Sequence, residues 1–212
     1  NWSSDILPSP YDRVIAEGAA VEYDLSDTSV RSLTMTGNSY LTLTSGSLKM
    51  SEDSVITNGL TINGGIIETE AELTIGGLNW ISGTVKGSGR LRLAGGRGTL
   101  ESGGETRLLG VRFVNAGYLT IKGILKAGEG AVIENVSERT ITLLTNAEIR
   151  NDVTTSGTAS LLNNGIIIRE SLDDALSVDI EATSATISIL LTSMETGSIR
   201  VEHGILKLAG TG

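Results

Sequence analysis

Short alternating triplets dominate the chain. In each of them two aliphatic residues flank one polar residue, and Gly, Asn, Ser or Asp follows soon after. Because successive side chains of a strand point to opposite faces, the two aliphatic residues share one face and the polar residue faces water. A helical period is absent over any window of useful length. The pattern therefore predicts an all-β protein with half-buried strands. Clear examples are Leu33–Met35, Leu41–Leu43, Leu48–Met50, Leu60–Ile62, Leu73–Ile75, Leu91–Leu93, Leu119–Ile121, Ile199–Val201 and Leu206–Leu208.

The spacing of the triplets indicates the architecture. They recur roughly every ten residues, which is typical of all-β folds and too close for βαβ units. Hairpin turns at Asn58-Gly59 or Asn63–Gly65 could join them, so a β-sandwich is the alternative. The segments also resemble one another, which favours stacked repeats. We predict a single-stranded parallel β-helix over residues 1–212 as one domain, with about nine coils of three strands each.

One phrase recurs before the strands: a polar residue, usually Asn, stands shortly before Gly. It occurs in 114–121, in 162–168 and, with Glu195 in place of Asn, in 194–201; 133–136 holds a partial copy without Gly. In stacked coils, inward asparagines would bond the backbone of neighbouring coils, and the glycines would supply a positive φ. The predicted ladder consists of Asn115, Asn135, Asn163, Gly117, Gly165 and Gly197.

Composition narrows the possibilities. Aromatic residues make up only 3% of the 212 residues, and 27 are Gly, which suits a narrow aliphatic core and many turns. Without Cys there is neither a disulfide framework nor a thiol nucleophile. The formal charge of −9 would repel phosphate backbones, so we expect no nucleic-acid partner. No apolar run is long enough for a membrane span, so we expect no membrane insertion.

The opening of the chain carries a family resemblance. Asn1–Ser4, Pro8–Asp12, Val14-Ile15, Gly18 and Val21 resemble the first coil of β-strand-repeat regions in large bacterial surface and secreted proteins, the autotransporter-like passenger regions. They are similar, more loosely, to the start of G8-type β-helix domains. The later Asn-x-Gly phrases and 199–208 resemble the same class. The resemblance implies an extracellular or cell-surface segment of a longer protein. Together with the preference of parallel crossovers, it implies a right-handed helix in which 1–12 caps the first coil.

Metal sites have weak support in the sequence. Asp173, Asp174 and Asp179 offer oxygen ligands that suit Ca²⁺, although their spacing matches no known calcium loop. His203 is the only histidine, and without Cys it cannot build a zinc site of the usual type. We expect no cofactor, with calcium as the one possibility.

Catalysis has one candidate location. Glu68, Glu70 and Glu72 alternate, so an extended strand would place them on one face, where mutual repulsion would raise at least one pKa. With Lys86 or Arg90 nearby, they could serve a polysaccharide lyase or hydrolase. Alternating Glu also describes an ordinary solvated strand, and we predict that the chain is no enzyme.

Ligand-binding surfaces have two further candidates. Trp2, Trp80, Tyr40 and Tyr118 could stack on sugar rings, but they do not look in register along the sequence. We expect Trp80 to pack at a corner of a coil. Flat Thr-x-Thr ladders would suit ice binding, and Thr34–Thr36 and Thr42–Thr44 fit this pattern. Lys, Arg and Glu replace Thr in later triplets, which predicts a broken threonine ladder and argues against ice binding.

The sequence thus favours a non-catalytic structural module of a cell-surface, extracellular-matrix or filament protein. A stack of coils would act as a rigid spacer, and uncapped ends could associate with other copies or with neighbouring domains of the same chain. A carbohydrate-binding or adhesin module, with glycans as partners, is the alternative. A polysaccharide lyase or hydrolase is the weaker one.

Overall fold

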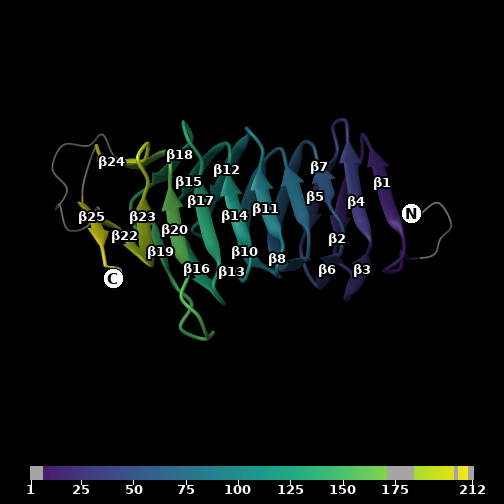
Figure 1. The fold of residues 1–212 in the computed structure, drawn as a ribbon. Helices are drawn as coiled ribbons and strands as arrows, with labels where there is room; N and C mark the ends of the chain where they lie inside the picture. The colour runs from purple at the N-terminus through teal and green to yellow at the C-terminus, as the bar shows by residue number, and fades with distance from the viewer. Residues whose placement is uncertain (1–6, 171–183, 203–204, 210–212) are drawn as a thin grey trace.

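The strands stack into an elongated right-handed parallel β-solenoid (Figure 1). The computed structural model describes residues 7–170, 184–202 and 205–209. All regular secondary structure in these ranges is β-strand. Every strand pairing within them is parallel, so the β-sandwich alternative is wrong, since hairpins would have made antiparallel pairs.

One face of the solenoid is a nine-stranded sheet, which we call the first face. Each of its strands comes from a different coil, and this confirms the predicted number of about nine coils. Its strands are β1 (Arg13–Glu17), β4 (Ser32–Thr36), β7 (Ser54–Ile56), β9 (Glu72–Ile75), β11 (Arg90–Leu93), β14 (Arg112–Asn115), β17 (Val132–Asn135), β20 (Ser160–Asn163) and β23 (Leu190–Ser193).

A 16-stranded sheet forms the other two faces. It is continuous because β8 (Gly59–Thr69) and β10 (Leu78–Lys86) run through the corner between them, where the pairing register shifts around Ser82. The second face also holds β2 (Ala20–Tyr23), β5 (Tyr40–Leu43), β12 (Arg97–Leu100), β15 (Tyr118–Ile121), β18 (Thr140–Leu143), β21 (Ile166–Arg169) and β24 (Ser198–Val201). The third face also holds β3 (Thr28–Val30), β6 (Ser47–Met50), β13 (Thr106–Leu109), β16 (Ile124–Gly128), β19 (Glu148–Asn151), β22 (Ser184–Ser188) and β25 (Ile205–Leu208).

The core consists of columns of aliphatic side chains, one residue from each coil. On the first face one such column contains Leu73, Leu91, Phe113, Ile133 and Leu161, all fully buried. Each residue loses its contact with water only because the coils above and below cover it, so burial of about 1.5 to 3 kcal/mol per side chain depends on stacking.

Trp80 is the largest side chain in this interior. It is fully buried on β10, and its indole N–H donates a hydrogen bond to the carbonyl oxygen of Gly83 at 3.3 Å. Gly83 lies at the bend where β10 passes from the second face to the third. The expected packing of Trp80 at a corner is confirmed.

The three predicted asparagines stack inside the solenoid. Asn115, Asn135 and Asn163 occupy one column of the first face and are fully buried. The amide of Asn115 donates to Oδ1 of Asn135 at 2.8 Å, and the amide of Asn135 donates to Oδ1 of Asn163 at 2.9 Å. The same amides reach backbone carbonyls of the next coil, those of Thr140 and Ile166. This agrees with the predicted asparagine ladder.

The predicted role of the ladder glycines is wrong. Gly117, Gly165 and Gly197 are not among the glycines with positive φ. Instead, the coil before each of them lies so close that a Cβ would collide with a backbone carbonyl oxygen, that of Gly96, Arg139 or Asn163 respectively. Glycine is needed there because two coils approach closely, and not because the chain turns into a left-handed conformation.

An insertion lengthens one coil. Asn115 and Asn135 are 20 residues apart, whereas Asn135 and Asn163 are 28 apart. The additional residues form a loop after β19, which projects from the rod in green (Figure 1).

Candidate functional site

A continuous column of polar side chains runs along the outside of the second face. Its members pair in register from coil to coil, and all are half-buried: Thr42, Thr61, Asn79, Thr99, Thr120 and Thr142. The threonine ladder is broken, as predicted, but by other residues: Asn79 interrupts it, and Glu22, Ile168 and Arg200 stand at the ends of the column. Lys49 on β6 and Arg92 on β11 belong to other faces and do not interrupt it.

The column beside it contains two tyrosines. Tyr40 pairs with Gly59, and further along Arg97 pairs with Tyr118. Gly77 continues this column between Gly59 and Arg97, because the next residues, Leu60 and Leu78, are paired. Tyr40 and Tyr118 are thus in register, contrary to the sequence-based interpretation.

Both rings are accessible. Tyr40 is 50% exposed and Tyr118 51% exposed, and the ring of Tyr40 lies over Gly59, where a Cβ would come within 3.0 Å of it. Tyr118 lies four strand spacings after Tyr40, which corresponds to roughly 19 Å at the ~4.8 Å spacing of paired strands. Trp80 is buried and contributes nothing to this surface, and Trp2 lies outside the described residues.

The glutamates considered for catalysis do not share a strand face. Glu68 belongs to β8 on the third face, the strand ends at Thr69, and Glu72 begins β9 on the first face. The chain turns a corner between them. The prediction that Glu68, Glu70 and Glu72 lie on one extended strand is therefore wrong.

Each of these carboxylates pairs with a cation. Glu68 lies between Lys49 and Lys86, at 3.0 and 3.1 Å, in successive coils. Hydrogen bonds from Lys49 and then Lys86 lower the pKa of Glu68, the opposite of the rise that a general acid needs. Glu72 pairs with Arg90 at 3.0 Å, beside an open depression of about 290 Å³. These pairs tie adjacent coils together.

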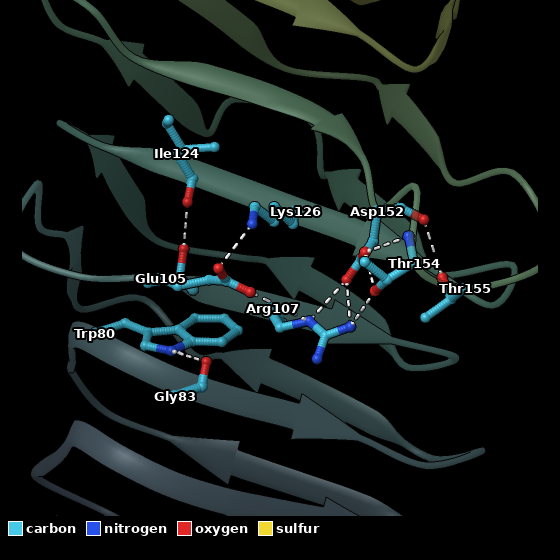
Figure 2. A network of polar contacts seen from close by, with 10 residues as sticks. Trp80, Gly83, Glu105, Arg107, Ile124, Lys126, Asp152, Thr154 and Thr155 are labelled. Carbon is cyan, nitrogen blue, oxygen red and sulfur yellow. Dashed lines mark hydrogen bonds and ion pairs between the residues drawn. The ribbon is translucent and has the colours of Figure 1, made fainter.

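A polar network around a buried aspartate joins the inserted loop to the third face (Figure 2). Arg107 on β13 donates to Oδ2 of Asp152 from Nε at 2.7 Å, and to the hydroxyl of Thr154 from Nη2 at 2.8 Å. Thr154 donates to Oδ1 of Asp152 through its backbone N–H, at 2.9 Å, and its hydroxyl, at 2.6 Å. Glu105 extends the network, since it pairs with Lys126 at 2.7 Å and lies 3.6 Å from Arg107.

Asp152 is held as an anion in this network. Its side chain is only 1% exposed, and this burial by itself would raise the pKa. The hydrogen bonds from Thr154 and the Arg107 guanidinium outweigh burial and lower the pKa to about 2. An aspartate in this state neither accepts nor donates a proton near neutral pH. It fixes the loop to the rod.

The sequence does not predict this network, because Arg107 and Asp152 are 45 residues apart and meet only through the stacking of coils. One local signal was available: Asp152 followed by Thr154 is a pattern in which the side chain caps the backbone two residues on.

The remaining candidates concern metals. Asp173, Asp174, Asp179 and His203 lie outside the described residues. In the ranges that the structure does describe, no three His, Asp or Glu side chains come together as a metal site would require. The same ranges contain no helix long and apolar enough to cross a membrane.

Comparisons of this chain with protein-family models, with curated proteins and with solved structures found no match.

Proposed function

We propose that this chain is a non-catalytic structural module that acts as a rigid spacer in a cell-surface, extracellular-matrix or filament protein. The observation that carries the proposal is the unbroken parallel ladder on all three faces through nine coils, wrapped around an aliphatic interior. Bending such a rod would stretch backbone hydrogen bonds on one face and compress side chains on the opposite one.

The outer surface supports this role. Opposite charges meet between adjacent coils, as in Lys49 with Glu68, Arg112 with Glu134 at 2.9 Å, and Lys122 with Glu101 at 3.0 Å. Exposed pairs of this kind contribute at most about 1 kcal/mol each, so they add little to stability but keep the exterior polar. An extracellular location is part of the proposal and depends on the resemblance of the repeat phrases to bacterial surface proteins.

Pulling on the two ends of a single molecule tests the spacer role. We expect no lengthening at low force and then discrete steps, because each coil contacts only its neighbours and can detach by itself. A coil of about 20 residues should release roughly 65 Å of chain. The same molecule in denaturant provides the control trace. Smooth lengthening without steps would contradict the spacer proposal.

A carbohydrate-binding module is the second candidate, and the exterior of the second face favours it. Tyr40 and Tyr118 can stack on sugar rings, while the adjoining column offers the hydroxyl groups of Thr42, Thr61, Thr99, Thr120 and Thr142 and the amide of Asn79. An extended polysaccharide along the rod would meet both kinds of contact.

Titration with soluble xylan, a neutral extended polysaccharide, tests this candidate. We expect Tyr118→Ala to weaken binding about tenfold, because an aromatic stacking contact of about 1.4 kcal/mol is lost. Tyr11→Ala is the control, since Tyr11 is 80% exposed and lies outside the column. Equal binding by both variants, or no binding by the unmodified chain, would rule out this surface as a xylan site.

A further inference from the structure

One stretch of the second face carries a single charged residue, Arg97. From Tyr40 to Tyr118, the outward column beside the threonines contains, coil by coil, Tyr40, Gly59, Gly77, Arg97 and Tyr118. Over the same coils the adjoining outward column contains Thr42, Thr61, Asn79, Thr99 and Thr120. The whole chain has 25 acidic and 16 basic residues. Since neither column holds an acidic residue here, an anion on this stretch meets Arg97 without a competing carboxylate.

Arg97 differs from the arginines that tie coils together. It is exposed, and within the part of the chain that the structure describes it forms no ion pair. On the first face, by contrast, Arg90 pairs with Glu72 at 3.0 Å and Arg112 with Glu134 at 2.9 Å. A guanidinium stays charged in proteins, and its N–H groups match both oxygens of a carboxylate. The charge of Arg97 is therefore available to an anionic group of a ligand.

Gly77 keeps the position before Arg97 free of a side chain. Its φ is not positive, and a Cβ would come no closer than 3.2 Å to its surroundings, at the carbonyl oxygen of Asn58. At Gly117, where two coils approach closely, the same distance is 2.2 Å. A side chain at position 77 would thus need only a small adjustment of its neighbours. The fold does not require this glycine, but a flat floor between the ring over Gly59 and the cation at 97 does.

The residues beside this floor can bind sugar hydroxyl groups. Asn79 stands on the same face, two residues after Gly77, and its amide can both donate and accept hydrogen bonds. Thr61 and Thr99 pair with Asn79 from the coils on either side. On the far side of Arg97, at the next strand, Tyr118 offers a second exposed ring. Aromatic rings, hydroxyl groups and one cation are therefore combined on a single flat surface.

We propose that this surface binds a polysaccharide that carries carboxylate groups, with Arg97 pairing with a carboxylate between the rings of Tyr40 and Tyr118. The inference deepens the carbohydrate-binding candidate and depends on it. It adds the class of sugar and names Arg97 as the residue that selects it. The net charge of −9 opposes a polyanion over the rest of the molecule, so a stretch that holds a cation and no carboxylate is favoured for such a ligand.

Glucuronoxylan, a xylan with uronic-acid side groups, tests the inference with the full chain. The comparison is the same polymer after its carboxyl groups have been reduced to alcohols. At low salt we expect the unmodified chain to bind the acidic polymer about fivefold more tightly, the factor that one good exposed ion pair contributes. Arg97→Gln should abolish this preference and leave binding of the reduced polymer unchanged. Salt at about 1 M should abolish it as well, because charges are then screened beyond roughly 3 Å.

Arg92→Gln is the matched control. Arg92 lies on β11, the strand before β12, but on the first face, and it forms no ion pair with the described residues. The substitution removes the same charge away from the proposed surface, so the preference for the acidic polymer should persist.

The possible contrary results separate this inference from the function on which it depends. Equal binding of the two polymers by the unmodified chain would overturn the role of Arg97 and leave the carbohydrate-binding candidate standing. A preference lost equally in Arg92→Gln and Arg97→Gln would overturn it too, because net charge and not this surface would then select the ligand. Failure to bind either polymer would overturn both the inference and the candidate.

Discussion

Replacing Asn135 with alanine is expected to lower the free energy of unfolding by about 3 to 5 kcal/mol. Asn135 is the middle residue of the asparagine ladder and is fully buried. Its amide donates to Oδ1 of Asn163 and reaches the carbonyl oxygens of Arg139 and Ile166 at 3.2 and 3.1 Å, and its own Oδ1 accepts from Asn115.

The expected loss of stability is large because Asn135→Ala leaves the polar partners of Asn135 inside the core. Alanine would take the donor away from the buried Oδ1 of Asn163 and would remove one hydrogen bond each from the amide of Asn115 and the carbonyl oxygens of Arg139 and Ile166. A buried polar atom that loses its partner costs about 1 to 3 kcal/mol. Replacing both the donor and the acceptor of a hydrogen bond with apolar groups would lower the stability less. Here some of the acceptors are backbone carbonyl oxygens, which no substitution removes. Water could take their place only by entering a cavity about the size of the lost amide.

Urea denaturation monitored by circular dichroism measures the effect. Asn164→Ala is the control, because this neighbouring side chain is not part of the buried column, and we expect a change within about 0.5 kcal/mol. Equal destabilisation by both substitutions would show that the ladder contributes no more than an ordinary turn residue.

What the sequence could predict was the repeating unit. The alternating triplets indicated strands, their similarity indicated stacking, and the recurrent phrase around Asn115 and Asn163 indicated inward asparagines, because each signal is local and repeats. The reason for Gly117 was not local. Its close neighbour is Gly96 of the preceding coil, and no turn preference reveals how near two coils approach.

The surface was harder to predict from the sequence because residues that are neighbours on it come from different coils. The threonine column is invisible when consecutive triplets are compared, because two strands intervene before the chain returns to the same face. Comparison of every third strand would have aligned Thr99, Thr120 and Thr142. The prediction that Glu68 and Glu72 share a strand face was wrong for a different reason. An alternating pattern of residues does not show that the chain turns a corner within it.

The stability of the rod should also depend on the charge of Asp152. Its pKa is about 2 in the folded protein and 3.8 in the unfolded chain. The folded state therefore binds the proton less readily. The resulting stabilisation, about 2 kcal/mol, is fully present above pH 3.8 and is lost as the pH falls through about 2.

Asp152→Asn removes this contribution while preserving the shape of the side chain. We expect the variant to be about 2 kcal/mol less stable than the unmodified chain at pH 6, and the difference to vanish near pH 2. Urea denaturation at pH values between 2 and 6 measures it. Asp27→Asn provides the control, since Asp27 is exposed and the difference there should stay small throughout.

The pH dependence of this stability difference shows which contacts hold the inserted loop on the rod. If the difference between Asp152→Asn and the unmodified chain stays constant with pH, the charge of Asp152 is irrelevant and Thr154 alone fixes the loop through neutral hydrogen bonds. If the difference narrows with acid as expected, the pair with Arg107 joins β13 to the loop across 45 residues of sequence. An ionic contact then secures a loop that makes its coil longer than the coil before it.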